Sequence, residues 1–310
     1  MIRGLLSIYT NPQLYWIVFV YIVTKFVELL TGSYNFWSQF WLDFVDYFGN
    51  DEFFEVYVSF AYTTLLYWIV GLLFIAINIT NKPKFLDKYK VQPNASLRSD
   101  SKKLLPVIGV VLFNQFVLNF LMFKIIAFYQ MMPNGIHLRQ TQSFPELLVT
   151  IVMYEFIYEF LFYYAHRLMH HKYFYNWIHK LHHKWTASIS IVAIYAHPIE
   201  HIVCNTLPIV LSLFILRTSY ATSGVIITMT TIWTLGDHSG YHIPFLHSSR
   251  FHDWHHSKFN ECFGTNGFLD KFHGTSKKFE ESGEILRHRT LFTLKSASEL
   301  YPNENDNKMN

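Results

Sequence analysis

The chain has 310 residues, of which 51% are hydrophobic and 15% charged, and its formal net charge is +3. This composition is too apolar for an ordinary soluble domain, and the small net charge gives no electrostatic support for nucleic-acid binding. With only two cysteines, Cys204 and Cys262, a disulfide framework and a cysteine zinc site are also excluded.

Apolar segments long enough to cross a bilayer, about 20 residues, recur along the chain. Four of them are predicted to span the membrane: Leu14–Leu30, Tyr57–Ile79, Leu104–Phe128 and Leu147–Ala165. Two further apolar stretches, His201–Leu216 and Tyr220–Leu235, are expected to form a short re-entrant or membrane-buried helical pair. We therefore expect an all-α membrane protein with about four transmembrane helices and a helical cap.

Loop charges predict the orientation of these helices, because loops rich in lysine and arginine stay in the cytosol. Segment Asn81–Lys103 carries seven lysine or arginine residues, whereas Thr31–Val56 carries none and has five acidic residues. The first segment should therefore be cytosolic and the second should face the lumen or exterior. The fourth span then returns the chain to the cytosol at His166, which places the cap there.

Histidines are concentrated in the second half of the chain. Of the 17 histidines, 14 fall between His166 and His256. They form four clusters: His166-x3-His170-His171, His179-x2-His182-His183, His238-x3-His242 and His252-x2-His255-His256. Neutral imidazole is a common ligand of first-row transition metals, and histidines three or four apart on a helix share a face. The pattern predicts a dimetal site with ten candidate ligands: His166, His170, His179, His182, His183, His238, His242, His252, His255 and His256.

Other polar residues are expected to support these ligands, since a metal-bound imidazole usually needs a hydrogen-bond acceptor on its second nitrogen. The candidates for this supporting role are Glu159, His171, His197, Glu200, Asp237 and Asp253. The remaining histidines are expected to be ordinary surface or interfacial residues: His137, His247, His273 and His288.

Two other functions fit parts of the pattern less well. His197-Pro-Ile-Glu200-His201 matches the His-x-x-Glu-His motif of inverted zinc proteases. A membrane zinc metalloprotease would leave the clustered histidines unexplained. A metal transporter should place ionisable ligands deep within its spans, and a catalytically silent scaffold should have lost ligands. Redox iron can activate dioxygen, and breaking an unactivated C–H bond requires such a cofactor. The sequence therefore favours a lipid-oxidising metal centre.

The stretch from Phe162 to Thr275 resembles the fatty acid hydroxylase/sterol desaturase superfamily of membrane di-iron enzymes, in particular its 4-methylsterol oxidases and fatty acid hydroxylase domain-containing proteins. The resemblance rests on His166-Arg-Leu-Met-His170-His171, Ile178-His179-Lys-Leu-His182-His183, Tyr195-Ala-His197-Pro-Ile-Glu200, His238-Ser-Gly-Tyr-His242, Phe251-His252-Asp-Trp-His255-His256 and Leu269-Asp-Lys-Phe-His273-Gly-Thr275. It assigns the same ten histidines as ligands. Some 4-methylsterol oxidases carry aspartate where this chain has His242.

The resemblance implies three regions: a membrane-spanning part over 1–145, a catalytic domain over 146–275 and a polar tail over 276–310. It implies two iron ions, which zinc can replace in purified protein. It also implies dioxygen, and electrons from NAD(P)H through a reductase and a separate cytochrome b5, in the endoplasmic reticulum membrane. The implied function is mono-oxygenation of a sterol, such as a 4-methylsterol in sterol biosynthesis. The alternative is hydroxylation of a fatty-acyl chain or a sphingolipid.

Overall fold

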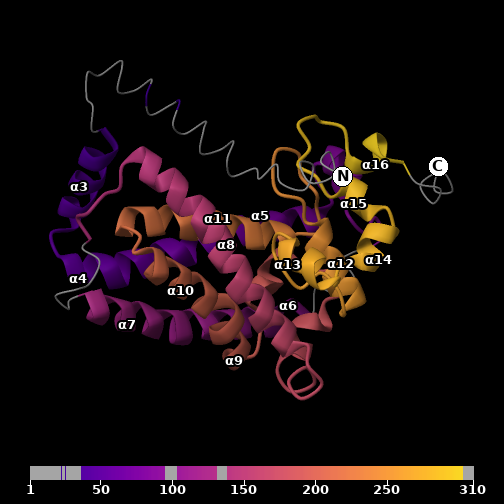
Figure 1. Cartoon of the computed structure of the whole chain (residues 1–310), viewed down its shortest axis with the longest axis horizontal. Coiled ribbons are helices and arrows are strands. Elements are labelled where there is room, and N and C mark those ends of the chain that lie inside the picture. The colour runs from indigo at the N-terminus through magenta and orange to yellow at the C-terminus, as the bar shows by residue number, and fades with distance from the viewer. Residues whose placement is uncertain (1–21, 23–24, 26–35, 95–102, 131–137, 303–310) are drawn as a thin grey trace.

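The computed structural model describes residues 22, 25, 36–94, 103–130 and 138–302. Within these ranges every named element is a helix, and the sole β pairing is an isolated bridge between Lys90 and Tyr241. Long helices lie side by side across most of the molecule, and short helices gather at one end (Figure 1). The predicted all-α fold is therefore confirmed.

Four helical rods in the described part of the chain are long and apolar enough to cross a membrane. They are Asp51–Thr80 (α4, Asp51–Phe53, and α5, Ser59–Thr80), Leu104–Tyr129 (α6, Leu104–Phe113, and α7, Phe120–Gln130), Phe144–Met169 (α8) and Pro198–Leu216 (α9, Pro198–Glu200, and α10, Leu207–Leu216). Three of these rods match predicted spans. The fourth covers the first member of the expected re-entrant or membrane-buried helical pair, and it contains 19 residues. The predicted span Leu14–Leu30 lies outside the described residues, apart from Ile22 and Lys25.

Three of the rods contain a π-helical turn, where the helix widens locally. These turns cover Phe54–Val58 (η1), Asn114–Asn119 (η5) and His201–Thr206 (η8). In two of them, polar side chains pair across neighbouring rods: His201 Nε2 lies 2.7 Å from Asn119 Oδ1. A buried polar group within an apolar rod needs such a partner. The turns therefore bring satisfied polar groups into the membrane helices, a frequent feature of functional sites.

The core next to the cap is built around η7 (Ser190–Ile194), a short 3₁₀ segment that packs between α5, α6 and α11 (Tyr220–Asp237). Ile191 and Leu235 are fully buried there, and the Tyr67 hydroxyl of α5 donates to the Ile191 carbonyl over 2.8 Å. Gly71 allows this approach, since a Cβ at its position would lie 2.8 Å from Ile191 Cγ2.

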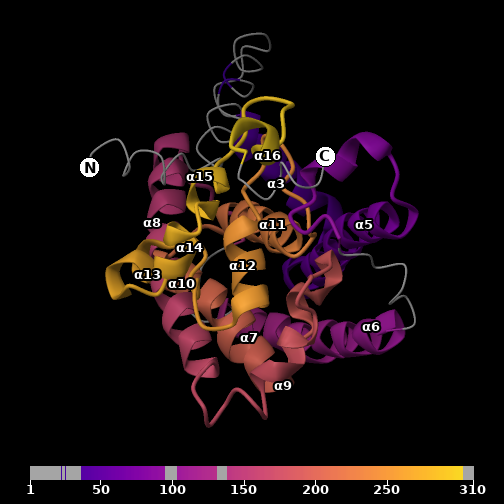
Figure 2. The ribbon, with the colours of Figure 1, turned by 90° about the vertical axis from the view of Figure 1, so that its right-hand side faces the viewer.

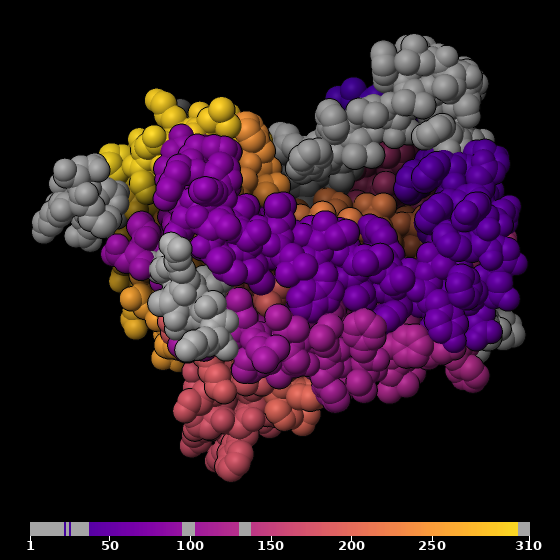
Figure 3. Space-filling model, turned by 180° about the vertical axis from the view of Figure 1, so that it is seen from behind, coloured from indigo at the N-terminus to yellow at the C-terminus, as the bar shows by residue number. Residues whose placement is uncertain are grey.

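At the opposite end of α5 from this core, α3 (Phe36–Phe48) adds an aromatic cluster in which Trp41 and Phe54 are buried. The earlier segments, coloured indigo to magenta, make up most of the described surface seen from behind, and yellow cap residues show at one end (Figure 3).

The cap is assembled from short helices that follow the long ones. It contains η6 (His179–Lys184), α12 (Arg250–Lys258), α13 (Phe268–His273), α14 (Lys277–Glu281), α15 (Glu284–Arg287) and α16 (Ala297–Leu300). Figure 2 looks onto this end, with α12 in front of the long helices. The described residues of the expected polar tail form part of the cap, and Phe279 and Leu291 are buried there. A 3₁₀ segment between two of the rods, η2 (Lys84–Tyr89), joins it through the Tyr89 hydroxyl, which donates to the Leu294 carbonyl.

Candidate metal centre

Nine of the ten predicted ligand histidines come together in two groups, and within each group the ligand atoms lie within 4.8 Å of one another. The five-histidine group contains His166, His170, His179, His183 and His255. The four-histidine group contains His182, His238, His252 and His256. The rings come from the end of α8, from η6, from the residue after α11, and from α12. Segments far apart in the sequence thus form two adjacent clusters.

In the five-histidine group, four Nε2 atoms form a closed ring. Neighbouring Nε2 atoms of His170, His179, His183 and His255 are 2.8 to 3.1 Å apart. Two nitrogens bound at right angles to one metal at about 2.1 Å lie about 3.0 Å apart. The His166 imidazole packs beside these four atoms, and its centroid lies 4.4 Å from the centroid of the His255 imidazole. The spacing therefore fits one metal ion.

The four-histidine group has similar spacing. His252 Nε2 lies 2.9 Å from His238 Nε2 and 3.0 Å from His256 Nε2, and His238 Nε2 lies 3.4 Å from His182 Nε2. The pairing of His182 with one group and His183 with the other follows from the 3₁₀ segment η6, in which successive side chains point in different directions.

Backbone carbonyls orient four of these rings. The Nδ1 atoms of His166 and His255 lie 2.7 Å from the carbonyl oxygens of Phe263 and Glu261, and those of His238 and His256 contact the carbonyls of Thr234 and Trp185. A carbonyl oxygen only accepts, so each Nδ1 carries the proton and each Nε2 keeps its lone pair. Lone pairs that converge at about 3 Å repel one another unless a cation lies between them. The donor set therefore fits imidazole-binding transition metals.

Electrostatics keep the rings neutral. Burial, followed by the neighbouring imidazoles, lowers the pKa of His170 to about 2, and burial lowers the pKa of His238 to about 4. Burial and nearby imidazoles also lower the pKa of His182, His255 and His256 well below the usual value. Neutral imidazole is the form that binds metal.

His242 is the predicted ligand that the structure does not bring into either group. Its Nε2 donates to the Arg289 carbonyl over 2.8 Å, and its Nδ1 accepts from Arg250 Nε over 3.3 Å. Both ring nitrogens are therefore engaged in holding the cap. The four-residue spacing from His238 does not bring the two together, because α11 ends at Asp237 and the chain leaves the helix between them.

The predicted supporting residues divide into two kinds. Glu200 contacts a grouped histidine directly: its Oε1 lies 2.8 Å from His179 Nδ1. Asp253 instead accepts from Gln92 Nε2 at 3.0 and 3.1 Å, and His197 Nδ1 caps α9 by accepting from the Ile199 amide. His171 is exposed and lies beside Tyr173.

Glu159 acts through the loop that follows α12. Its Oε2 accepts from the Thr265 amide and hydroxyl and from the Asn266 amide, at 2.7 to 2.9 Å. On the other side of the loop, Asp270 accepts from the amides of Phe263 and Gly264 at 2.8 and 2.7 Å. The two carboxylates fix the loop whose carbonyls hold His166 and His255.

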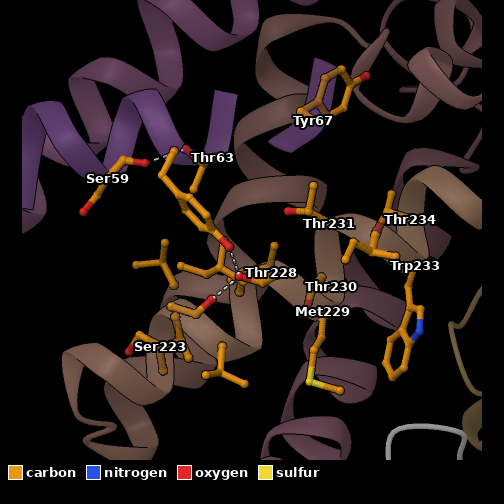
Figure 4. Close-up of a pocket in the computed structure, with 18 of the residues that line it drawn as sticks. Ser59, Thr63, Tyr67, Ser223, Thr228, Met229, Thr230, Thr231, Trp233 and Thr234 are labelled. Carbon is orange, nitrogen blue, oxygen red and sulfur yellow. Dashed lines mark hydrogen bonds between the residues drawn. The ribbon is translucent and has the colours of Figure 1, made fainter. Parts of the chain in front are cut away.

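A cavity of about 1780 Å³ reaches the centre from the membrane helices. Its lining is predominantly aromatic and aliphatic, and it includes His166 and His179 of one group and His182, His238 and His252 of the other. Figure 4 shows part of the wall, where Ser59 and Tyr67 of α5 lie across from Thr228 and Thr231 of α11. An apolar cavity of this size that opens onto both groups suits a lipid.

One lining histidine was not among the predicted site residues. His247, expected at the surface or an interface, lines the cavity together with Asp237, 3.9 Å away. Burial lowers the pKa of His247 to about 4, so this ring is neutral too. The carbonyl partners of the ligand rings were also beyond sequence reasoning, because every residue carries a carbonyl.

Comparison with known proteins relates this arrangement to a family. The family model described as fatty acid hydroxylase matches residues 150–275. The chain is 35% identical over 272 residues to fatty acid hydroxylase domain-containing protein 2 of Homo sapiens, covering 87% of this chain and 82% of that protein. It is 32% identical to a putative methylsterol monooxygenase of Dictyostelium discoideum, covering 82% and 94%.

A third relative is a fatty acid hydroxylase of Mycosarcoma maydis, 34% identical over 68% of this chain and 55% of that protein. No solved structure matches the chain. The matched family segment begins within α8 and ends at Thr275, two residues after α13. It therefore contains every histidine of both groups.

Proposed function

Because the chain belongs to the fatty acid hydroxylase family, we propose that this oxidoreductase is a membrane di-iron mono-oxygenase that hydroxylates a sterol. The observation that carries the proposal is the meeting of two imidazole groups with one apolar cavity. The nine grouped histidines are the proposed ligands. When bound, a pair of iron ions supplies the dioxygen activation that an unactivated C–H bond requires.

The protein's own residues bind and orient the partners of this reaction. Glu200 and the carbonyls of Phe263 and Glu261 fix the ligand rings and hold their Nδ1 protons. The apolar walls of the cavity keep water away from the reacting C–H bond, and they hold the lipid against the two groups. Repeated hydroxylation of a 4-methyl group would give the acid needed for its removal.

The sterol assignment is supported by the relatives that are named methylsterol monooxygenases, one of which the chain covers over 94% of its length. A fatty-acyl or sphingolipid substrate is the second candidate, because the relative from Mycosarcoma maydis is named a fatty acid hydroxylase. The proposed electron donor is cytochrome b5 with its NAD(P)H-dependent reductase, at the cytosolic face of the endoplasmic reticulum.

Lipid analysis of cells that lack the protein tests the substrate. We expect 4-methylsterols to accumulate and wild-type protein to reverse this, whereas His255→Ala should not, because it removes a ligand from the five-histidine group. The matched control is His171→Ala, which changes an exposed histidine outside both groups and should rescue fully.

Loss of 2-hydroxylated acyl chains without a sterol change would instead favour the second candidate. Unchanged lipids, or full rescue by His255→Ala at normal protein level, would contradict both. Elemental analysis of gently purified protein should find two iron ions per chain, or zinc in their place.

A further inference from the structure

Two polar side chains face the cavity at the end where it meets the metal centre. Asp237 is the last residue of α11, directly before His238 of the four-histidine group, and its side chain is 19% exposed. His247 is 23% exposed, and both residues line the cavity. The Trp233 ring, also in the lining, lies beside His247 with its centroid 5.9 Å away. A bound lipid would meet these two polar groups close to the metal centre.

The separation of the two groups fits a bridging ligand atom. His247 Nε2 and Asp237 Oδ1 are 3.9 Å apart, which is too long for a direct hydrogen bond. An oxygen about 2.8 Å from both atoms would make an angle of about 90° between them, within the range that a hydroxyl group accommodates. A hydroxyl can donate to an oxygen of Asp237 and accept from the ring, whereas an ether oxygen can only accept.

From these contacts we propose that Asp237 and His247 form a hydroxyl-binding site that makes the enzyme select lipid alcohols over the corresponding ethers. This inference rests on the proposed function and specifies its substrate class. In a 4-methylsterol, the carbon that bears the 3-hydroxyl is bonded to the carbon that carries the methyl group. Holding that hydroxyl beside His238 therefore presents the methyl group to the metal centre.

The test compares two ligands that differ at the oxygen alone, a 4-methylsterol and its 3-O-methyl ether. Their binding to metal-loaded full-length protein in detergent should differ roughly tenfold or more in favour of the alcohol, because the ether cannot donate the hydrogen bond to Asp237. Asp237→Asn should abolish or reverse this preference, since an amide N–H donates to the ether oxygen.

The matched control is Asp253→Asn. Asp253 also lies beside a grouped histidine, His252, but it is bonded to Gln92 and is not part of the cavity lining. It should keep the wild-type preference. A second variant, His247→Phe, keeps a ring but removes the donor, and it should weaken binding of the alcohol and of the ether alike, about tenfold each, because both oxygens accept from the ring.

Equal binding of alcohol and ether by the wild type would overturn the hydroxyl site while leaving the sterol function intact. A preference that survives in Asp237→Asn, or that disappears equally in Asp253→Asn, would overturn it as well. If the wild type neither binds nor oxidises either sterol while metal content is normal, the proposed sterol function itself fails.

Discussion

At the scale of single residues, His242 differs from the other nine predicted ligands, because it lies in neither histidine group. The sequence presents it as an equal partner of His238, but both of its nitrogens are engaged by Arg250 and Arg289. A hydrogen-bonded ring of this kind contributes to stability through its neighbours, and it has no lone pair left for a metal.

Replacing these histidines one at a time tests the assignment. On the proposed two-ion assignment, His255→Ala should lower the metal content below two ions per chain, because it breaks the closed ring of Nε2 atoms in the five-histidine group. His242→Ala should retain both ions and lower the free energy of unfolding by about 1–2 kcal/mol, through loss of its hydrogen bonds. Elemental analysis and thermal unfolding in detergent measure the two effects. Loss of metal in His242→Ala, with the wild-type metal content in His255→Ala, would contradict the assignment of His255 as a ligand and of His242 as a structural residue.

The ligand set shows what sequence spacing can and cannot predict. Clusters such as His252-x2-His255-His256 indicate the centre because helical spacing alone puts neighbouring rings within reach of a metal. The division of His182 and His183 between two groups depends on the 3₁₀ geometry of η6, and the position of His247 depends on how the loop after α11 folds back. Such tertiary placement leaves no periodic signal in the sequence.

At the scale of elements, the loop between α12 and α13 links α8 to the metal centre. Gly264 lies where it can tolerate no side chain, since a Cβ would overlap the Glu159 carboxylate and lie 2.8 Å from Asp270 Oδ2. The glycine is thus a requirement for the close approach of two carboxylates to one loop, and the loop in turn supplies the carbonyl that holds His166.

Gly264→Ala should therefore displace the loop and withdraw the Phe263 carbonyl from His166. We expect the free energy of unfolding to fall by roughly 1–3 kcal/mol, as for a buried donor left unpaired, and metal to be lost first from the five-histidine group. Gly109→Ala is the matched control, because a Cβ there meets no atom within 4 Å. Spectroscopy of cobalt-substituted protein can distinguish the two groups, and an unchanged spectrum in Gly264→Ala would contradict the argument.

The π-helical turns were not predicted, because hydropathy reports only that a rod is apolar. Two of them depend on each other through the contact between His201 and Asn119. Asn119→Leu and His201→Leu should each lower the free energy of unfolding in detergent by about 1–3 kcal/mol, since each leaves the other polar group buried without its partner. The double variant should lose less than the sum of the two, and strictly additive losses would show that the contact contributes nothing.

At the scale of the whole molecule, the four candidate spans place the cap at one end of the rods, and loop charges predict that this end is cytosolic. Both native cysteines are buried, so an introduced cysteine would react over a low background. In sealed microsomes, Lys84→Cys, 76% exposed as lysine in the wild type, should react with a membrane-impermeant maleimide. Tyr47→Cys, at a position 84% exposed in the wild type, should react only after detergent is added. The opposite pattern would invert the topology.

The order of the ligands along the chain also constrains how the protein is made. When the ribosome has completed α11, every candidate span found in the described residues has been synthesised, yet one of the five histidines of one group and three of the four of the other are still to come: His255, and His238, His252 and His256. The carbonyls of Glu261 and Phe263 follow later still. A nascent chain therefore enters the membrane with both groups incomplete, and on the proposed function the metal would bind only after translation has passed the loop that holds the rings. Iron starvation should accordingly leave full-length, inserted apoprotein rather than truncated chains.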